Sequence, residues 1–231
     1  MARAGGPRQL ALALDHVQSF AREDFVAGPS NAAALALIDA WPDWPARSVA
    51  LIGPPGSGKS HLAAVWAAES GARFASGRAL EHGDLPATLA TGALVVEDLA
   101  EGRFGERALF HLLNLAREDG AFMLLTARSG PAGWTLAIND LASRLRALPV
   151  VTLAVPDDAL LRPVLVKLFA DRQLAVDDSL IGFLMTRIER SFAGARAAVE
   201  ALDREALRQH RPVTRALAAE LWRSKADSAA P

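Results

Sequence analysis

The sequence predicts an α/β fold in which a parallel five-stranded sheet is followed by a small all-helical domain. Three observations lead to this prediction. Short apolar segments typical of buried strands alternate with helical patterns over residues 48–153, and such alternation implies a parallel sheet. A glycine-rich loop separates the first strand from the helix that follows it. Beyond Pro156 the strand pattern ends, and only helical patterns follow.

The α/β part begins with a helix over residues 32–38, which Ser30 and Asn31 can cap. A second helix follows the glycine-rich loop at residues 60–70, and a third, amphipathic helix covers residues 104–118. The five predicted strands cover residues 48–52, 73–75, 93–96, 122–126 and 150–153.

The helical part starts at Asp157 and Asp158, which can cap a helix through Phe169. Three more helices are predicted at residues 179–191, 194–210 and 213–224. The chain is therefore expected to consist of a mobile tail at 1–22, an α/β domain at 23–156, a helical domain at 157–226 and a short tail at 227–231.

Composition limits the function classes. The 231 residues are 51% hydrophobic, which is enough for a substantial core. With 25 basic and 26 acidic residues the net charge is -1, so the overall charge indicates no nucleic-acid or anionic-membrane partner. The absence of cysteine excludes disulfides and thiolate metal sites. The apolar run at residues 10–14 is too short for a membrane span or signal peptide, so we expect a cytoplasmic protein without membrane contact.

The most specific motif is the loop Gly-Pro-Pro-Gly-Ser-Gly-Lys-Ser at residues 53–60. Its glycines let backbone N–H groups converge on phosphate oxygens, while Lys59 adds a full charge and Ser60 can hold magnesium. A match at every fixed position, between a strand and a helix, predicts a P-loop that binds nucleotide. The residues expected at the nucleotide are Pro55, Gly56, Ser57, Gly58, Lys59, Ser60 and His61.

Glu97 and Asp98 end a buried strand of the predicted sheet. A P-loop needs a carboxylate that holds the water shell of its magnesium ion, and parallel strands end at the same edge of a sheet. We therefore expect both acids at the nucleotide, with Glu97 holding Mg²⁺ and its neighbour polarising the attacking water.

The P-loop, the acidic pair, two later arginines and the helical domain together resemble the AAA+ ATPases of the DnaA branch. Residues 25–31 resemble the adenine-side segment of that family, which implies nucleotide contacts from Phe25, Val26 and Asn31. Residues 140–145 resemble the box with the arginine finger, which implies that role for Arg144. The sequence Gly-Ala-Arg-Ala-Ala-Val places Arg196 at the second sensor, on a helical lid.

Two strand ends depart from that family. The acidic pair reads Glu97-Asp98, whereas the family usually places aspartate first. The strand end of the first sensor reads Thr126-Ala127-Arg128, so the resemblance assigns Thr126 to that role and leaves Arg128 without one. We therefore expect weak intrinsic ATP hydrolysis, with ADP or ATP and Mg²⁺ as ligands.

The tail sequence Gln-Leu-Ala-Leu-Ala-Leu at residues 9–14 resembles a sliding-clamp-binding peptide. Apolar anchors in an extended segment can dock into a preformed pocket, although such a segment can equally pack as a strand on its own domain. The chain also ends about where the DNA-binding domain of DnaA would begin. The residues expected to bind the clamp are Gln9, Leu10, Leu12 and Leu14.

These features resemble the regulatory inactivators of DnaA within that branch. The resemblance implies DnaA and the DNA polymerase III sliding clamp as partners, with DNA reached through the clamp. It also implies that Arg144 acts in trans on ATP held by DnaA, because a guanidinium stabilises charge on the transferring phosphoryl group. An ordinary surface ion pair is the alternative for Arg144, and Arg146 is its nearest rival for the finger. Self-association is left open.

Three other functions remain open at this stage. The same core suits a DnaA-like initiator or helicase loader that acts directly at DNA, although no DNA-reading element is visible. A metabolic P-loop kinase would need an acceptor pocket, for which the sequence gives no support. A scaffold would bind nucleotide only for stability.

Overall fold

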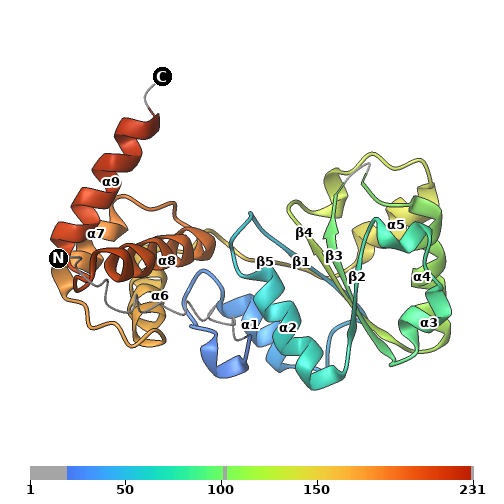
Figure 1. Ribbon diagram of the computed structural model, residues 1–231. Coiled ribbons are helices and arrows are strands. Elements are labelled where there is room, and N and C mark those ends of the chain that lie inside the picture. Colours follow the sequence, from blue (N-terminus) through green and yellow to red (C-terminus); the bar gives the residue numbers. More distant parts are fainter. Residues whose placement is uncertain (1–19, 101–102, 230–231) are drawn as a thin grey trace, which may run out of the picture.

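The structure is a computed structural model that describes residues 20–100 and 103–229. The predicted clamp-binding motif at residues 9–14 lies outside the described residues. Within them, the chain forms an α/β part and an all-helical part that lie side by side (Figure 1). No helix in the described ranges is both long and apolar enough to cross a lipid bilayer.

One sheet of parallel strands forms the centre of the α/β part. The strands are β1 (Ser48–Ile52), β2 (Arg73–Ser76), β3 (Ala93–Leu99), β4 (Phe122–Ala127) and β5 (Val150–Thr152). Their order across the sheet is β2-β3-β4-β1-β5, which confirms the predicted parallel five-stranded sheet. Because the strands are parallel, the carboxyl ends of β1, β3 and β4 meet at one edge, where ligands of such sheets bind.

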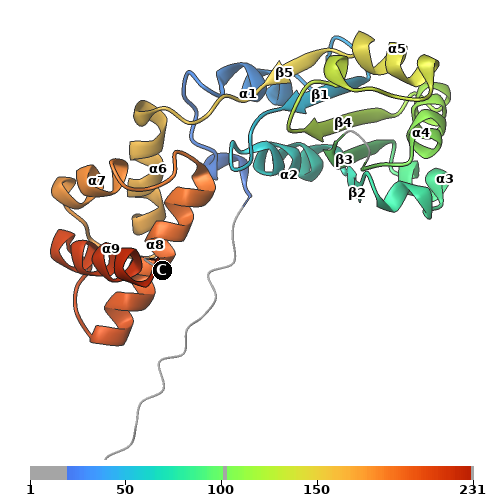
Figure 2. The same cartoon turned by 90° about the horizontal axis from the view of Figure 1, so that it is seen from above.

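Helices cover both faces of the sheet (Figures 1 and 2). Their bounds are α1 (Ala32–Asp39), α2 (Lys59–Ser70), α3 (Leu85–Leu89), α4 (Glu106–Glu118) and α5 (Asn139–Ala147). Val95 of β3 packs with α1 and α2, whereas its neighbours Leu94 and Val96 pack with α3, α4 and α5. This alternation follows from the strand period of two, and burial of all three residues is typical of a parallel sheet covered on both faces.

The helical part, hereafter the lid, consists of helices packed around their own core. They are α6 (Asp158–Ala170), α7 (Asp178–Met185), α8 (Phe192–Gln209) and α9 (Arg215–Ala229). Leu161, Leu165 and Phe169 of α6 are fully buried among residues of the other lid helices. As predicted, Asp157 caps α6, because its side chain accepts a hydrogen bond from the N–H of Leu160 at 2.8 Å.

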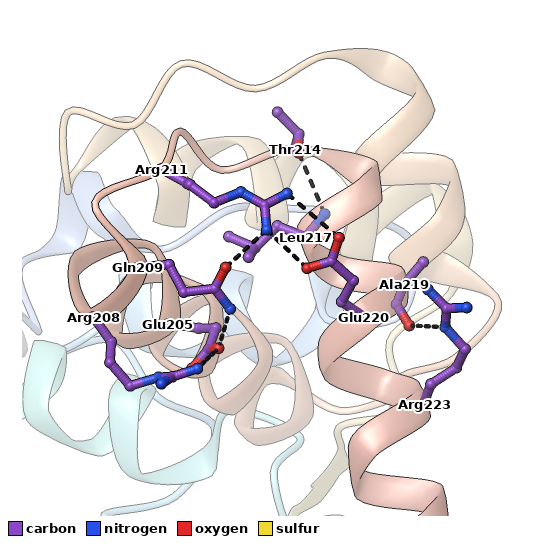
Figure 3. Close-up of polar contacts among 9 residues, drawn as sticks. All are labelled: Glu205, Arg208, Gln209, Arg211, Thr214, Leu217, Ala219, Glu220 and Arg223. Atoms are coloured by element: carbon purple, nitrogen blue, oxygen red, sulfur yellow. Dashed lines mark hydrogen bonds and ion pairs between the residues drawn. The ribbon is translucent and has the colours of Figure 1, made fainter.

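Ion pairs hold the turn between α8 and α9 (Figure 3). Arg211, which follows α8, pairs with Glu220 of α9 at 2.9 Å. Within α8, Glu205 accepts hydrogen bonds from Arg208 and Gln209, which lower the pKa of its carboxyl to about 2. Exposed pairs of this kind add little stability, so the buried core holds the lid helices together.

β3 is longer than predicted. It continues through Glu97 and Asp98 to Leu99, because Glu97 still pairs with Ser76 of β2 while the pairing to β4 shifts between Val96 and Leu99. The acidic pair therefore lies inside an irregular strand end and not after the strand.

Several helices also differ from the predictions. α7 ends at Met185 instead of residue 191. α8 begins at Phe192, where Ser191 caps it by accepting the N–H of Gly194 at 2.9 Å. α9 continues to Ala229, beyond the predicted start of the terminal tail. α3 and α5 are not among the predicted helices.

Candidate nucleotide-binding site

Residues 53–60 connect β1 to α2, which confirms the predicted strand, loop and helix around the P-loop. Gly56 and Gly58 have φ angles of 70° and 101°, a left-handed region that favours glycine. Gly58 is the N-cap of α2 and has no side chain with which to cap it. The first N–H groups of α2 therefore remain available to an anion, and the positive end of the helix dipole favours one there.

Lys59 lies inside the loop and is only 8% exposed. Its Nζ donates hydrogen bonds to the carbonyl oxygens of Gly53 at 2.8 Å and Pro54 at 2.9 Å. Burial lowers the pKa of its ammonium group, the negative charge of Asp98 raises it, and the positive charge of Arg128 lowers it. Both of those side chains therefore act electrostatically on the P-loop lysine.

Ser57 gives a test of whether the loop fits phosphate. Its side chain is 1% exposed, and its hydroxyl has no hydrogen-bond partner among the described residues. A buried unpaired hydroxyl costs about 1–3 kcal/mol, which a phosphate oxygen in the loop would relieve. Ser60 is exposed in the first turn of α2, where it remains the predicted magnesium ligand. The loop thus fits a nucleotide.

The acidic pair is held from the neighbouring strand. Thr126 of β4 is buried, and its Oγ1 accepts a hydrogen bond from the N–H of Asp98 at 3.2 Å. Asp98 has a φ of 53°, which costs a residue with a side chain about 1–3 kcal/mol. The assignment of Mg²⁺ to Glu97 stays a prediction, but Asp98 is the carboxylate whose charge acts on Lys59.

Asn31 shapes the predicted adenine-side segment from within. Its Oδ1 accepts a hydrogen bond from the N–H of Gly28 at 2.8 Å, and its Nδ2 donates to the carbonyl oxygen of Val26 at 2.9 Å. It is the N-cap of α1, but its side chain makes no capping hydrogen bond. Its buried amide therefore fixes the backbone that would face the nucleotide.

The imidazole of His61 lies against two phenylalanine rings. Its ring centroid is 5.3 Å from that of Phe20 and 5.2 Å from that of Phe25, both in edge-to-face geometry. Nε2 lies 3.2 Å from the carbonyl oxygen of Ala21, and because a carbonyl only accepts, Nε2 carries the proton. Burial lowers the pKa of this histidine. These rings form an apolar wall beside the P-loop.

A cavity of about 700 Å³ lies between the P-loop, the segment at residues 20–26 and the lid. The structure brings most of the predicted nucleotide contacts to this cavity. The predicted residues that line it are Phe25, Val26, Gly56, Gly58, Lys59, Ser60, His61 and Arg196. The predicted site residues that are not in its lining are Asn31, Pro55, Ser57, Glu97, Asp98 and Thr126.

Several lid residues at the cavity are missing from the sequence predictions. Lys167 of α6 pairs with Asp24 at 2.6 Å and with Asp171 at 3.1 Å, and its bond to Asp24 joins the lid to the start of the α/β part. Arg172 and Glu200 also line the cavity. No local pattern marks these residues, because only the packing of the lid brings them to the P-loop.

Arg144 lies elsewhere. Its guanidinium carbon is 5.0 Å from the ring centroid of Phe110, so α5 is stacked on α4 at this point. Glu106, in the first turn of α4, accepts hydrogen bonds from the N–H groups of Ala137 at 3.1 Å and Ile138 at 2.9 Å, at the start of α5. Arg144 does not line the cavity between the P-loop and the lid of its own chain.

Known structures share this fold. No protein-family model matches the sequence, and no curated protein matches it. The chain is similar to domain III of the replication initiation protein DnaA from Thermotoga maritima, with a TM-score of 0.74, 19% identity and coverage of 89% of this chain and 96% of that chain.

Two further similar structures are longer than this chain. AMPPCP-bound DnaA from Aquifex aeolicus has a TM-score of 0.66 and 16% identity, with coverage of 78% of this chain and 64% of that chain. The RuvB Holliday junction branch migration motor of Thermotoga maritima has a TM-score of 0.66 and 17% identity, with coverage of 89% and 72%. At such low identity these likenesses establish the fold, which is that of the AAA+ domains of DnaA and RuvB.

Proposed function

Since the chain has the AAA+ fold, we propose that it is a nucleotide-binding regulator of replication initiation, similar to Hda. In this proposal it stimulates hydrolysis of the ATP held by DnaA, with Arg144 as an arginine finger in trans. The observation that supports this most is the place of Arg144, which stacks on α4 and does not line the nucleotide cavity of its own chain.

The chain's own site would hold ADP or ATP with Mg²⁺. The P-loop would receive the phosphates, Lys59 and Arg196 would pair with them, and the wall formed by Phe25 and His61 would face the base. When bound, Mg²⁺ would neutralise phosphate charge, with Ser60 and the acidic pair as its protein-side ligands. The left-handed strand end at Asp98 leaves the acids in an unusual geometry, in keeping with weak intrinsic hydrolysis.

The stacking of Arg144 suits a finger. A guanidinium held over a ring by cation–π attraction can still offer N–H donors to an anion. Charge that grows on a transferring phosphoryl group would be stabilised by such donors, and an arginine finger in trans is worth about 10³–10⁵ in rate.

We further propose that the motif at Gln9, Leu10, Leu12 and Leu14 binds the DNA polymerase III sliding clamp. This contact would place the chain on DNA indirectly, close to DnaA. The near-neutral net charge of -1 is in keeping with DNA contact through a partner.

Reconstitution tests the proposal. The full chain is mixed with ATP-loaded DnaA, sliding clamp and DNA, and conversion of bound ATP to ADP is measured in single turnover. We expect conversion only with all components present, and an Arg144→Ala variant that binds ADP normally should lose it. The matched control is Arg146→Ala, which removes an exposed arginine of the same helix and should retain activity. Full stimulation by Arg144→Ala would refute the finger.

The likeness to RuvB favours a second candidate, an ATPase that acts directly at DNA. It requires DNA binding by the chain alone, with an affinity that falls steeply with salt. A mobility shift with the pure protein at two salt concentrations separates this candidate from the first.

A further inference from the structure

Arg128 follows the carboxyl end of β4, at the edge of the sheet where the P-loop begins. β4 pairs with β1 so that Ala127 lies opposite Ile52, and the N–H of Gly53 donates a hydrogen bond to the carbonyl oxygen of Ala127 at 3.1 Å. The carbonyl oxygen of Gly53 in turn accepts a hydrogen bond from Nζ of Lys59 at 2.8 Å. The backbone of Arg128 therefore lies beside the segment that anchors the P-loop lysine.

The side chain of Arg128 is open to a ligand. It is exposed, and no hydrogen bond or ion pair joins its guanidinium to another residue of the described chain. Burial lowers the pKa of the Lys59 ammonium group most, the charge of Asp98 raises it, and the charge of Arg128 lowers it. The two cations are thus close enough to repel each other, and an anion bound to both would relieve that repulsion.

Acids and bases balance at the carboxyl ends of the central strands β3, β4 and β1. In the described part of the chain, the end of β3 carries Glu97 and Asp98, Arg128 follows β4, and the loop after β1 carries Lys59. These charges sum to zero. Without Arg128 the sum would be negative, and it would oppose a ligand that brings further negative charge to this edge.

Arg128 lies outside the cavity between the P-loop and the lid, whereas Lys59 lines it. The cavity is also lined by the rings of Phe25 and His61 and by charged residues of the lid, so it would hold the base and the ribose of any nucleotide. The phosphates would then run past Lys59 towards the ends of β3 and β4. The phosphate farthest from the base would meet Arg128, and a diphosphate would end before it.

We propose that Arg128 binds the terminal phosphate of a nucleoside triphosphate and makes the site prefer a triphosphate to a diphosphate. A guanidinium can donate two parallel hydrogen bonds to phosphate oxygens. Its charge also offsets the carboxylate of Asp98, which would otherwise repel that phosphate. The inference rests on the proposed nucleotide binding and adds a preference that the proposed function leaves open. It requires neither DnaA nor the clamp.

Calorimetric titration of the full chain with ADP and with AMPPCP, a triphosphate analogue that resists hydrolysis, measures this preference. The quantity compared is the ratio of the two dissociation constants at one Mg²⁺ concentration. Arg128→Gln should weaken AMPPCP binding about tenfold, the effect of one charged hydrogen-bonded pair in a partly exposed site, and should change ADP binding less than about twofold. Arg128→Lys, which keeps the charge but loses the paired donors, should weaken AMPPCP binding only about two- to threefold.

Arg78→Gln is the matched control. Arg78 is also exposed and follows a strand at the same edge of the sheet, but that strand is the outermost one, β2. The control changes the net charge of the chain by the same amount and should leave the ratio unchanged. An unchanged ratio in Arg128→Gln would overturn the proposal. An equal change of the ratio in Arg78→Gln would overturn it as well, because net charge alone would then explain the effect.

The same titrations in EDTA test whether Arg128 contacts the phosphate directly. The loss of preference in Arg128→Gln should persist without Mg²⁺, and its disappearance would overturn the proposal. If the preference is lost as expected in a chain that never stimulates DnaA, only the regulatory function is refuted. If the preference is unchanged in a chain that stimulates DnaA, only this inference is refuted.

Discussion

The backbone N–H of Phe192 donates a hydrogen bond to the carbonyl oxygen of Gly56 at 3.0 Å, which ties the first turn of α8 to the P-loop. Arg196 lies one turn further along the same helix. Any movement of α8 that shifts Arg196 therefore also pulls on the loop that would hold the phosphates. This hydrogen bond couples the position of Arg196 to that of the P-loop.

Gly56→Ala should disrupt that junction. A Cβ at Gly56 would lie 2.8 Å from Cβ of Ser191 and 3.3 Å from Cβ of Ala193, and its φ of 70° is already unfavourable for alanine. We expect a loss of about 1–3 kcal/mol of unfolding free energy in urea, together with weaker ADP binding. Gly71→Ala is a matched control, because it has the same φ and no atom within 4 Å. Equal behaviour of the two variants would show that only backbone strain matters.

Lys167→Ala should loosen the lid from the segment at residues 20–26. The ion pair between Lys167 and Asp24 is partly exposed, at 30% and 23%, so its loss should cost at most about 1 kcal/mol. The clearer effect should be faster amide hydrogen exchange in that segment and in α6. Arg162→Ala, which removes an exposed ion pair within the lid, should leave the segment's exchange unchanged.

His61 should make stability depend on pH. Burial depresses its pKa below the ordinary value of 6.5, so the unfolded chain binds the proton more readily than the folded chain. The stability contribution is fully present above about pH 6.5 and is lost as the pH falls towards the folded pKa. His61→Gln should show a shallower loss of unfolding free energy between about pH 6.5 and 5. The same dependence of unfolding free energy on pH in the parent chain and in His61→Gln would contradict this prediction. His82→Gln, which changes an exposed histidine, serves as the control.

Glu106→Ala should free the start of α5. Two backbone N–H groups, of Ala137 and Ile138, lose their acceptor, at a cost of about 1 kcal/mol. We expect stimulation of DnaA to fall while ADP affinity stays unchanged, because α5 carries Arg144 but does not line the cavity. Glu106→Gln keeps one acceptor oxygen, so its stimulation of DnaA should lie between that of the parent chain and that of Glu106→Ala. If ADP binding fell instead, the effect would be on the whole fold.

Local patterns predicted most of the fold. The five apolar strands and the P-loop follow from periodicity and turn chemistry, and all are present. The short α3 escaped prediction because five residues give too little periodicity. α5 starts at Asn139 without a side-chain cap of its own, and Glu106 from another helix accepts hydrogen bonds from the N–H groups of the two residues that precede it.

Only those residues of the candidate site that belong to a continuous sequence motif were predicted. The P-loop, His61 and Arg196 could be placed from motifs, and the structure assembles them at one cavity. Arg172, Lys167 and Glu200 carry no motif, because their relation to the P-loop arises only when the lid packs against it. Asn31 is the N-cap residue of α1, as predicted, but its side-chain amide bonds to the backbone of Gly28 and Val26 and makes no capping hydrogen bond, which the sequence does not reveal.

The separate core of the lid has a thermodynamic consequence. The buried cluster of α6 to α9 shares no residue with the two clusters on the faces of the sheet. Each part is therefore stabilised by its own hydrophobic core, and few contacts couple the unfolding of one part to the unfolding of the other. A ligand held between the two parts adds its binding free energy only while both are intact, so it converts two loosely coupled folding units into one cooperative unit.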